Sequence, residues 1–419
     1  MKHSASESAT RKSPQFAAAL SRAGDTSQAV QEVCDAILSS RAANDDADQP
    51  DNASASPTLV LAFFSPHHAA NAAALAGGIC DRLQTTALIG CSGESIAGGG
   101  EEIEDGPALS VWAADLPGAD VQLMQLDYAR AADGGSFVGW PDALIDAWPE
   151  RAALLLLGEP FSFPADVLLE SLGDEHPGVS VIGGMAGGGH GPGENRLIFG
   201  RGEVRQGAVA AMLSGSVRVR PVVSQGCRPI GQPYVITKAE RNIVHELGGK
   251  QPLALLKELF ATLPVEDQRM MQSGLHLGRV TNEYQEGFQR GDFLVRNVIG
   301  VDGETGAIAI GDYVRTGQTV QFHLRDAASA DEDLRELLAA VKEDAVKEGG
   351  HAAAALLFTC NGRGTRLFDA PHHDAAAIRS VLGEIPLAGF FAQGEIGPIG
   401  GRSFVHGFTA SLAVFEAAD

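Results

Sequence analysis

The pattern of hydrophobic and polar positions repeats three times along the chain. Each repeat opens with a continuous apolar run, and these runs are LVLAFF at 59–64, LLLL at 154–157 and ALLF at 355–358. A segment with helical periodicity follows each run. A second apolar strand then ends at a glycine dipeptide, which is Ile89-Gly90, Ile182-Gly183 or Ala388-Gly389. The first strand and the dipeptide lie about thirty residues apart, the length of a strand-helix-strand unit. With the strand that closes each repeat, we predict three β-α-β-β units.

The apolar runs also predict how the units pack. Strands without polar positions are buried on both faces, so that each face needs a layer of helices or another sheet over it. We therefore expect an α/β protein of two related lobes, each with a mixed β-sheet covered by helices. A four-layer α-β-β-α stack, with the two sheets face to face, is the arrangement that we expect.

The segments outside the repeats differ in character. Residues 1–14 are polar and Ser-rich, Phe16 to Ser39 carries apolar residues at nearly helical spacing, and Arg41 to Pro57 is rich in Asp without a large apolar residue. A segment that buries no apolar surface cannot offset its loss of conformational entropy. We expect residues 1–57 to form a flexible tail, a short helix and an acidic loop.

The region between the second and third repeats has alternating strands and two helical segments instead of a β-α-β-β unit. It reads as part of a second domain. We place the two main domains at residues 58–216 and 217–419, each of ordinary size.

Charge and cysteine usage narrow the function classes. The chain has 53 acidic and 31 basic residues, a net charge of −22, which disfavours binding to nucleic acids and to anionic membranes. The apolar runs are far shorter than the roughly 18 residues that cross a bilayer, and no signal peptide is evident, so we expect a cytoplasmic protein. The five cysteines are scattered, which argues against a disulfide framework or a zinc ribbon.

Six ordered motifs carry a family resemblance. They are FFSPHH, IGCSGESIAGG, GQPYVITKAERNIVHELGGKQPLALL, FLVRNVIGVDGETGAIAIGDYVRTGQTVQFHLRD, LLFTCNGRG and LAGFFAQGEIGPIGG. Together they resemble the FIST family (F-box and intracellular signal transduction), with an N-terminal and a C-terminal FIST domain. The resemblance covers the chain from about Phe16 onward.

The resemblance implies a sensory domain that binds a small ligand, with amino acids as the ligand class, and implies neither catalysis nor a cofactor. The motifs leave no residues for a kinase, a cyclase or an F-box. We therefore expect a stand-alone sensor whose signalling output partner, if it has one, is a separate chain.

The first candidate site is Cys360-Asn361-Gly362-Arg363, directly after a buried strand. Ligands of open α/β sheets are held at the carboxyl ends of strands. Arg363 supplies a planar donor fork for a carboxylate, and Asn361 adds a donor and an acceptor. The alternative is that Arg363 forms a structural ion pair with Glu395 or Asp369.

A second candidate motif places a carboxylate just beyond a second strand. It occurs as Gly394-Glu395 in the third repeat and as Ser92-Gly93-Glu94 in the first. A carboxylate there can accept hydrogen bonds from the ammonium group of a ligand. Since Asn361, Arg363 and Glu395 leave neighbouring strands of one unit, we expect them to converge on one pocket.

Two other readings stay open. Cys91 or Cys360 could be the nucleophile of a cysteine-dependent hydrolase, or a carboxylate could serve hydrolysis, although the sequence shows no partner base. The protein could also be a scaffold that binds only another protein. We predict no metal site, because Pro66-His67-His68 and Pro371-His372-His373 place adjacent side chains on different helix faces.

Overall fold

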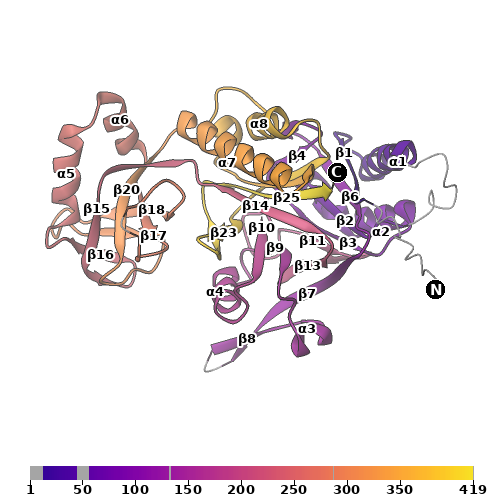
Figure 1. Cartoon of the computed structure of the whole chain (residues 1–419), viewed down its shortest axis with the longest axis horizontal. Coiled ribbons are helices and arrows are strands. Elements are labelled where there is room, and N and C mark those ends of the chain that lie inside the picture. The colour runs from indigo at the N-terminus through magenta and orange to yellow at the C-terminus, as the bar shows by residue number, and fades with distance from the viewer. Residues whose placement is uncertain (1–12, 45–55, 132–133, 286, 419) are drawn as a thin grey trace, which may run out of the picture.

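The structure, a computed structural model, describes residues 13–44, 56–131, 134–285 and 287–418. It contains three α/β units in chain order and a β-barrel (Figure 1). The mixed sheets and the helices that cover them confirm the α/β class and the β-α-β-β units.

The elements of the first unit are β1 (Gln15–Ser21), α1 (Thr26–Asn44), β2 (Leu59–Phe64), α2 (Ala72–Leu83), β3 (Leu88–Ser92), β4 (Ile96–Gly98), β5 (Glu101–Ile103) and β6 (Leu109–Asp115). Those of the second are β7 (Ala119–Ala131), β8 (Gly134–Val138), α3 (Asp142–Asp146), β9 (Ala152–Gly158), α4 (Ala165–Glu175), β10 (Val179–Met185), β11 (Leu197–Phe199), β12 (Gly202–Val204) and β13 (Ala208–Gly215). The third unit has β14 (Arg218–Ser224), α7 (Ala327–Lys347), β21 (Gly350–Cys360), α8 (His373–Leu382), β22 (Leu387–Ala392), β23 (Glu395–Ile399), β24 (Arg402–His406) and β25 (Ala410–Ala418).

The three units exchange hairpins in a cycle. The sheet orders are β1-β6-β2-β3-β11-β12, β24-β23-β10-β9-β13-β7-β8 and β14-β25-β21-β22-β4-β5. In each sheet the first strand of the β-α-β-β unit, which is β2, β9 or β21, pairs in parallel with the second strand, β3, β10 or β22. It pairs antiparallel with the last strand, β6, β13 or β25. The outer edge of the second strand then receives the hairpin of another unit. None of the three sheets is therefore built from a single unit.

The glycine of each dipeptide is required by the backbone. A Cβ on Gly90, Gly183 or Gly389 would lie 2.0, 1.9 or 2.0 Å from the carbonyl oxygen of the neighbouring first strand, on Ala62, Leu156 and Leu357 respectively. Real Cβ atoms do not approach so closely, so only glycine fits. The three dipeptides are thus equivalent positions, as their recurrence in the sequence predicts.

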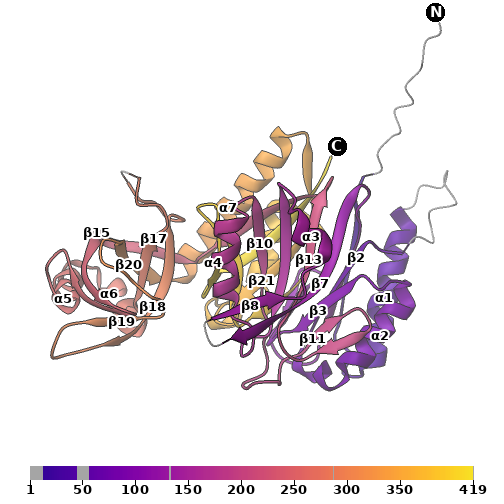
Figure 2. The same ribbon diagram turned by 90° about the horizontal axis from the view of Figure 1, so that it is seen from below.

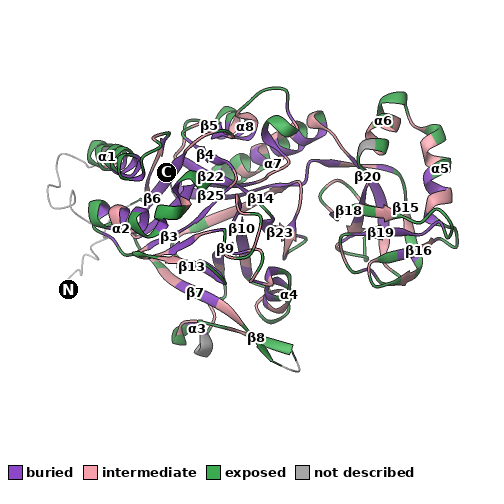
Figure 3. Cartoon of the chain, turned by 180° about the vertical axis from the view of Figure 1, so that it is seen from behind, coloured by how far each residue is buried: buried purple, intermediate pink, exposed green. Residues whose placement is uncertain are grey.

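The inner faces of the three sheets share one core. Phe63 stacks on Phe390 at 5.2 Å and Trp112 lies 4.8 Å from Phe415, which joins the first sheet to the third. Leu155 and Val209 add the second sheet to the same cluster. The outer faces are covered by α1 and α2, by α3 and α4, and by α7 and α8 (Figure 3). Because three sheets surround this core, the expected four-layer stack of two sheets does not describe the fold.

The barrel is an insertion in the third unit. Its elements are β15 (Cys227–Glu240), β16 (Ile243–Leu247), α5 (Pro252–Thr262), α6 (Val265–Ser273), β17 (His276–Val280), β18 (Phe293–Val301), β19 (Ile308–Ile310) and β20 (Thr319–Arg325). It lies between β14 and α7, where the first unit has only residues 22–25 between β1 and α1. Figures 1 and 2 place it at the end of the molecule opposite to α1 and α2.

The N-terminal prediction was partly wrong. Phe16 lies in strand β1, which pairs antiparallel with β6, and the helix begins only at Thr26. Successive side chains of β1 face opposite sides of the sheet: Phe16 packs in the central core and Ala17 packs against the helices of the first unit. The predicted tail and most of the acidic loop lie outside the described residues. The domain boundary between Ser216 and Val217 stays a prediction.

Candidate ligand-binding site

The ends of the three second strands meet at one point. Met185 N–H donates to Gly394 O at 2.7 Å, and Gln393 N–H donates to Met185 O at 3.0 Å. Gly187 N–H donates to Ser92 O at 2.9 Å. The loops that the sequence singled out are therefore neighbours in space, although they belong to different units.

These contacts align the units residue by residue. Ser92, Met185 and Phe391 make the same backbone hydrogen bond, to Arg196 O, Gly394 O and Ser95 O respectively, at 2.7–2.8 Å. The residues that follow the three acceptors are Leu197, Glu395 and Ile96, and each pairs with an equivalent strand residue. Glu395 thus occupies a buried position that the other units fill with an aliphatic side chain.

Glu395 is 1 % exposed, and its two oxygens have different surroundings. Oε2 accepts hydrogen bonds from the N–H and the hydroxyl of Thr409, at 3.0 and 2.8 Å. Oε1 accepts no hydrogen bond from the described residues. Burial raises the pKa of Glu395 to about 8, so the group is mainly neutral at pH 7.

Cys360 lies beside Glu395 and is not an activated thiol. Burial, and next the charge of Glu395, raise the pKa of Cys360 to about 12. Burial likewise raises the pKa of Cys91 well above its ordinary value. A nucleophilic cysteine needs a lowered pKa, so neither environment favours the hydrolase reading.

Arg363 does not have the free donor fork that the sequence led us to expect. It is fully buried, and its Nε and Nη2 donate to the carboxylate of Asp374 at 2.8 and 2.7 Å. Although burial opposes ionisation, the Arg363 guanidinium keeps the pKa of Asp374 below its ordinary value. The internal partner is therefore Asp374 rather than Glu395 or Asp369. Nη1 has no hydrogen-bond partner among the described residues.

Arg363 Nη1 points toward the junction between the barrel and the third unit. A Cβ built on Gly226, the residue before β15, would lie 3.0 Å from it. Arg325, the last residue of β20 and the partner of Cys227 in the sheet, closes the same junction. Its Nη2 donates to Gly362 O at 2.9 Å, and its guanidinium lies 4.7 Å from the ring centre of Phe408.

Further unpaired polar atoms gather here. Arg325 Nε and His276 Nδ1 have no hydrogen-bond partner in the described part of the chain. His276 packs edge-on against Phe408, with ring centres 4.8 Å apart, and burial lowers the pKa of His276 to about 4. Phe408 itself has φ of 72°, a conformation that is costly for an aromatic residue. We call the set His276, Arg325, Cys360, Arg363, Glu395 and Phe408 the neck site.

The other predicted residues lie around the neck site. Asn361 is half-buried and its Oδ1 accepts no hydrogen bond from the described residues. Gly362 and Gly394 contribute the carbonyls described above. Ser92 is buried and its hydroxyl accepts from Arg196 N–H at 3.1 Å, whereas Glu94 forms an ion pair with Arg366. The side chains of Ser92 and Glu94 therefore serve contacts outside the neck site.

Sequence reasoning missed the barrel side of the site, namely Arg325, His276 and Phe408. Arg325 ends a strand in which apolar and polar residues alternate, directly before Asp326, the N-cap of α7. The sequence signal that could have indicated this site is a basic residue at the point where the chain leaves the barrel and returns to the third unit.

The Pro-His-His motifs have structural roles. His68 is buried with Nδ1 3.0 Å from Thr26 Oγ1, and His372 Nδ1 accepts from Glu102 N–H at 2.8 Å. His373 lies between Asp331 and Asp374 and stacks on Phe368. No group of three or more His, Cys, Asp or Glu side chains that could hold a metal occurs in the described ranges.

Comparison with known protein families shows the class of protein to which the chain belongs. The chain matches the FIST N domain over residues 58–250 and the FIST C domain over residues 252–398. The chain belongs to the FIST family, whose domains are sensory domains of signal transduction.

Two mycobacterial relatives show the extent of the likeness. The uncharacterized protein Mb0898c of Mycobacterium bovis is 43 % identical over 359 residues, which cover 86 % of this chain and 90 % of that protein. The uncharacterized protein Rv0628c of Mycobacterium tuberculosis is 42 % identical over 366 residues, 87 % of this chain and 92 % of the relative. The described part of the chain has no helix long and apolar enough to cross a membrane.

Proposed function

We propose that this protein senses a small ligand, which binds at the neck site between the barrel and the third unit. The observation that carries the proposal is the set of buried polar atoms without partners: Arg325 Nε, Arg363 Nη1, His276 Nδ1 and Glu395 Oε1. A buried polar group without a hydrogen bond costs about 1–3 kcal/mol. A ligand that satisfies several such groups at once gains this free energy on binding.

The ligand class that fits is a small molecule with a carboxylate and an ammonium group, as in an amino acid. The two guanidinium nitrogens are donors for the carboxylate, and Glu395 Oε1 is an acceptor for the ammonium group. Asn361 offers a further acceptor at the edge. Arg363 takes part through Nη1 alone, because Asp374 occupies its fork.

Binding without catalysis is the activity that we propose, with a separate output protein as partner in the cytoplasm. The raised pKa values of Cys91 and Cys360 support this. Neither a nucleic acid nor a membrane is among the proposed partners, since the net charge of −22 opposes both.

A thermal-shift screen of the amino acids tests the proposal. A ligand at 100 times its Kd adds about 2.7 kcal/mol of stability, which raises the melting temperature by several degrees. Arg325→Gln should then weaken binding of that ligand at least tenfold, since it removes a charged donor.

The matched control is Arg315→Gln, which changes an exposed arginine of the same barrel. It should leave the affinity unchanged. Equal affinities of the two variants, or no shift with any amino acid, would contradict the proposal.

A further inference from the structure

A groove on the barrel stands apart from the neck site. It lies between α5, the end of α6 and the second half of β18, and its volume is about 520 Å³. Figure 1 shows α5 and α6 at the end of the molecule farthest from α1 and α2. None of the neck-site residues lines the groove.

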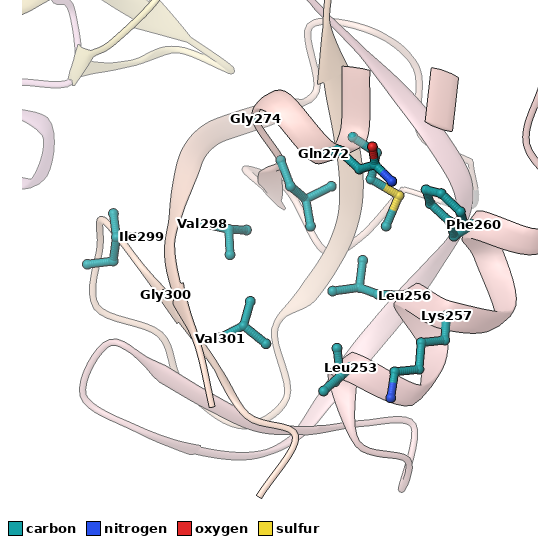
Figure 4. A pocket seen from close by; sticks show the side chains of 12 residues that line it. Leu253, Leu256, Lys257, Phe260, Gln272, Gly274, Val298, Ile299, Gly300 and Val301 are labelled. Atoms are coloured by element: carbon teal, nitrogen blue, oxygen red, sulfur yellow. The ribbon is translucent and has the colours of Figure 1, made fainter. Parts of the chain in front are cut away.

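The lining is mainly apolar and comes from three elements. Leu253, Leu256 and Phe260 belong to α5, Met271 and Leu275 flank the end of α6, and Val298 and Val301 belong to β18. In Figure 4 the side chains of Leu256, Val298 and Val301 face the same space. Pockets for small molecules have such walls, with a few polar groups that fix orientation, and volumes of roughly 300–1,000 Å³.

The polar groups of the groove are Lys257 and Gln272 (Figure 4). Lys257 forms no ion pair with a carboxylate of the described residues, whereas Lys250, just before α5, pairs with Glu258 at 3.2 Å. In a chain with net charge −22, an unpaired cation at the rim of an apolar groove is complementary to a ligand anion.

The barrel surface is unusually apolar. Seven of the twelve exposed large apolar side chains of the described residues lie in it, namely Val235, Ile243, Val265, Tyr284, Ile299, Val301 and Tyr313. The barrel spans residues 227–325, less than a quarter of the chain. Ile299 and Val301, which line the groove, are 62 % and 50 % exposed. Exposed apolar residues that lie together, as Ile299 and Val301 do at the groove, mark sites of interaction.

We propose that the groove binds a small amphipathic anion, with an unbranched or aromatic apolar body between α5 and β18 and one carboxylate at Lys257. The volume of about 520 Å³ lies within the range of small-molecule pockets. The inference concerns a second site and does not depend on the ligand of the neck site.

Decanoate tests the inference, with 1-decanol as an uncharged probe of the same chain length. Calorimetry or fluorescence competition on the full-length protein should show one saturable decanoate site, with weaker binding of 1-decanol. Lys257→Gln should weaken decanoate binding about fivefold or more, which corresponds to about 1 kcal/mol, and should leave 1-decanol unaffected. Lys238→Gln, on an exposed lysine of β15, is the control and should change neither.

A second pair of variants tests the apolar wall. Val301→Asp places a carboxylate in the groove and should weaken both probes, decanoate at least tenfold, whereas Val235→Asp, at an equally exposed position outside the groove, should not. Both residues are half-exposed, so that both variants should fold. The proposal is overturned if decanoate does not saturate, if Lys257→Gln and Lys238→Gln behave alike, or if Val301→Asp binds decanoate normally.

Discussion

The third unit shares the backbone of the first two but differs from them at its centre. The backbone hydrogen bonds that align Cys360 with Ser65 and Glu159 also align Arg363 with His68 and Ser162. The third unit has an arginine at the position of His68 and Ser162, and a buried glutamate, Glu395, at the position of Ile96 and Leu197. It also has a barrel where the first unit has only residues 22–25. Sites of function lie where a repeated fold departs from its own rule. The comparison therefore supports the neck site as the place of the proposed ligand.

The largest expected effect tests whether the units are equivalent. Gly90→Ala, Gly183→Ala and Gly389→Ala should each cost at least about 5 kcal/mol, enough to prevent folding, because the Cβ meets a carbonyl oxygen at about 2 Å. Gly77→Ala, in the open interior of α2, should be neutral or stabilising by up to about 1 kcal/mol. Soluble expression and urea denaturation measure the difference. A mild effect at any one of the three would break the alignment of the units.

The next effect concerns the fully buried ion pair of the third unit, Arg363 with Asp374. Asp374→Asn leaves Arg363 buried without its carboxylate and should cost about 3 kcal/mol. Asp174→Asn, in the exposed pair with Arg402, should cost less than about 1 kcal/mol. Chemical denaturation measures the free energy of unfolding of the two variants. Similar losses would mean that the buried ion pair contributes no more to stability than the exposed one.

Stability should depend on pH through buried titratable groups of the third unit, of the barrel and of strand β5. Burial raises the pKa values of Glu395 and Glu102 to about 8, in Glu102 with help from Asp374. Between their unfolded value near 4.5 and pH 8 the folded state holds more protons, so stability falls as the pH rises. Burial lowers the pKa values of His276, His323 and His406 to about 4, so stability rises from pH 4 to 6.5.

We therefore expect maximal stability near pH 6.5. Glu395→Gln should reduce the decline between pH 6.5 and 8.5 by an amount on the order of 1 kcal/mol or more. Urea midpoints at the two pH values, for wild type and variant, measure it. An unchanged slope would show that Glu395 is already ionised in the folded protein.

The smallest effect sharpens the comparison at Cys360. Since the first unit has a serine at the equivalent position, Cys360→Ser should cost less than about 1 kcal/mol of stability. Ligand affinity should stay within about fivefold of wild type. Loss of the ligand response in this variant would reopen a chemical role for the thiol.

Much of the fold could be predicted from the sequence because its signals are local. Continuous apolar runs mark the first strands, and Gly90, Gly183 and Gly389 mark the positions where the second strand lies too close to the first for a side chain. The exchange of hairpins could not be predicted. Strands such as β4 and β11 have only three residues, which are too few for their sequence to indicate the strand with which they pair. The apolar residues of β1 continue the nearly helical spacing of the segment that follows, so the sequence predicted a helix. In the structure β1 is an edge strand that pairs with β6.

The candidate site was predictable on one side only. Asn361 and Arg363 were identified by a glycine-rich turn at the end of a buried strand, and Glu395 by a glycine-carboxylate motif that also occurs in the first unit. The pairing of Arg363 with Asp374 was not evident from the sequence. Arg363 lies in the loop before α8 and Asp374 lies in the first turn of α8, and other carboxylates, such as Asp369, are equally near in sequence. Arg325 and His276 come from the inserted barrel, and no repeat of the chain offers a position for comparison.

The central claim is that a zwitterionic ligand binds against Glu395 at the neck site. Titration calorimetry at pH 7 in two buffers of different ionisation enthalpy, with the amino acid that raises the melting temperature, tests it directly. Glu395 is mainly protonated before binding, and a ligand ammonium group favours its ionised form. The account predicts release of close to one proton in wild type, and none together with at least tenfold weaker binding in Glu395→Gln. Equal affinity and equal proton release in the two proteins would contradict it.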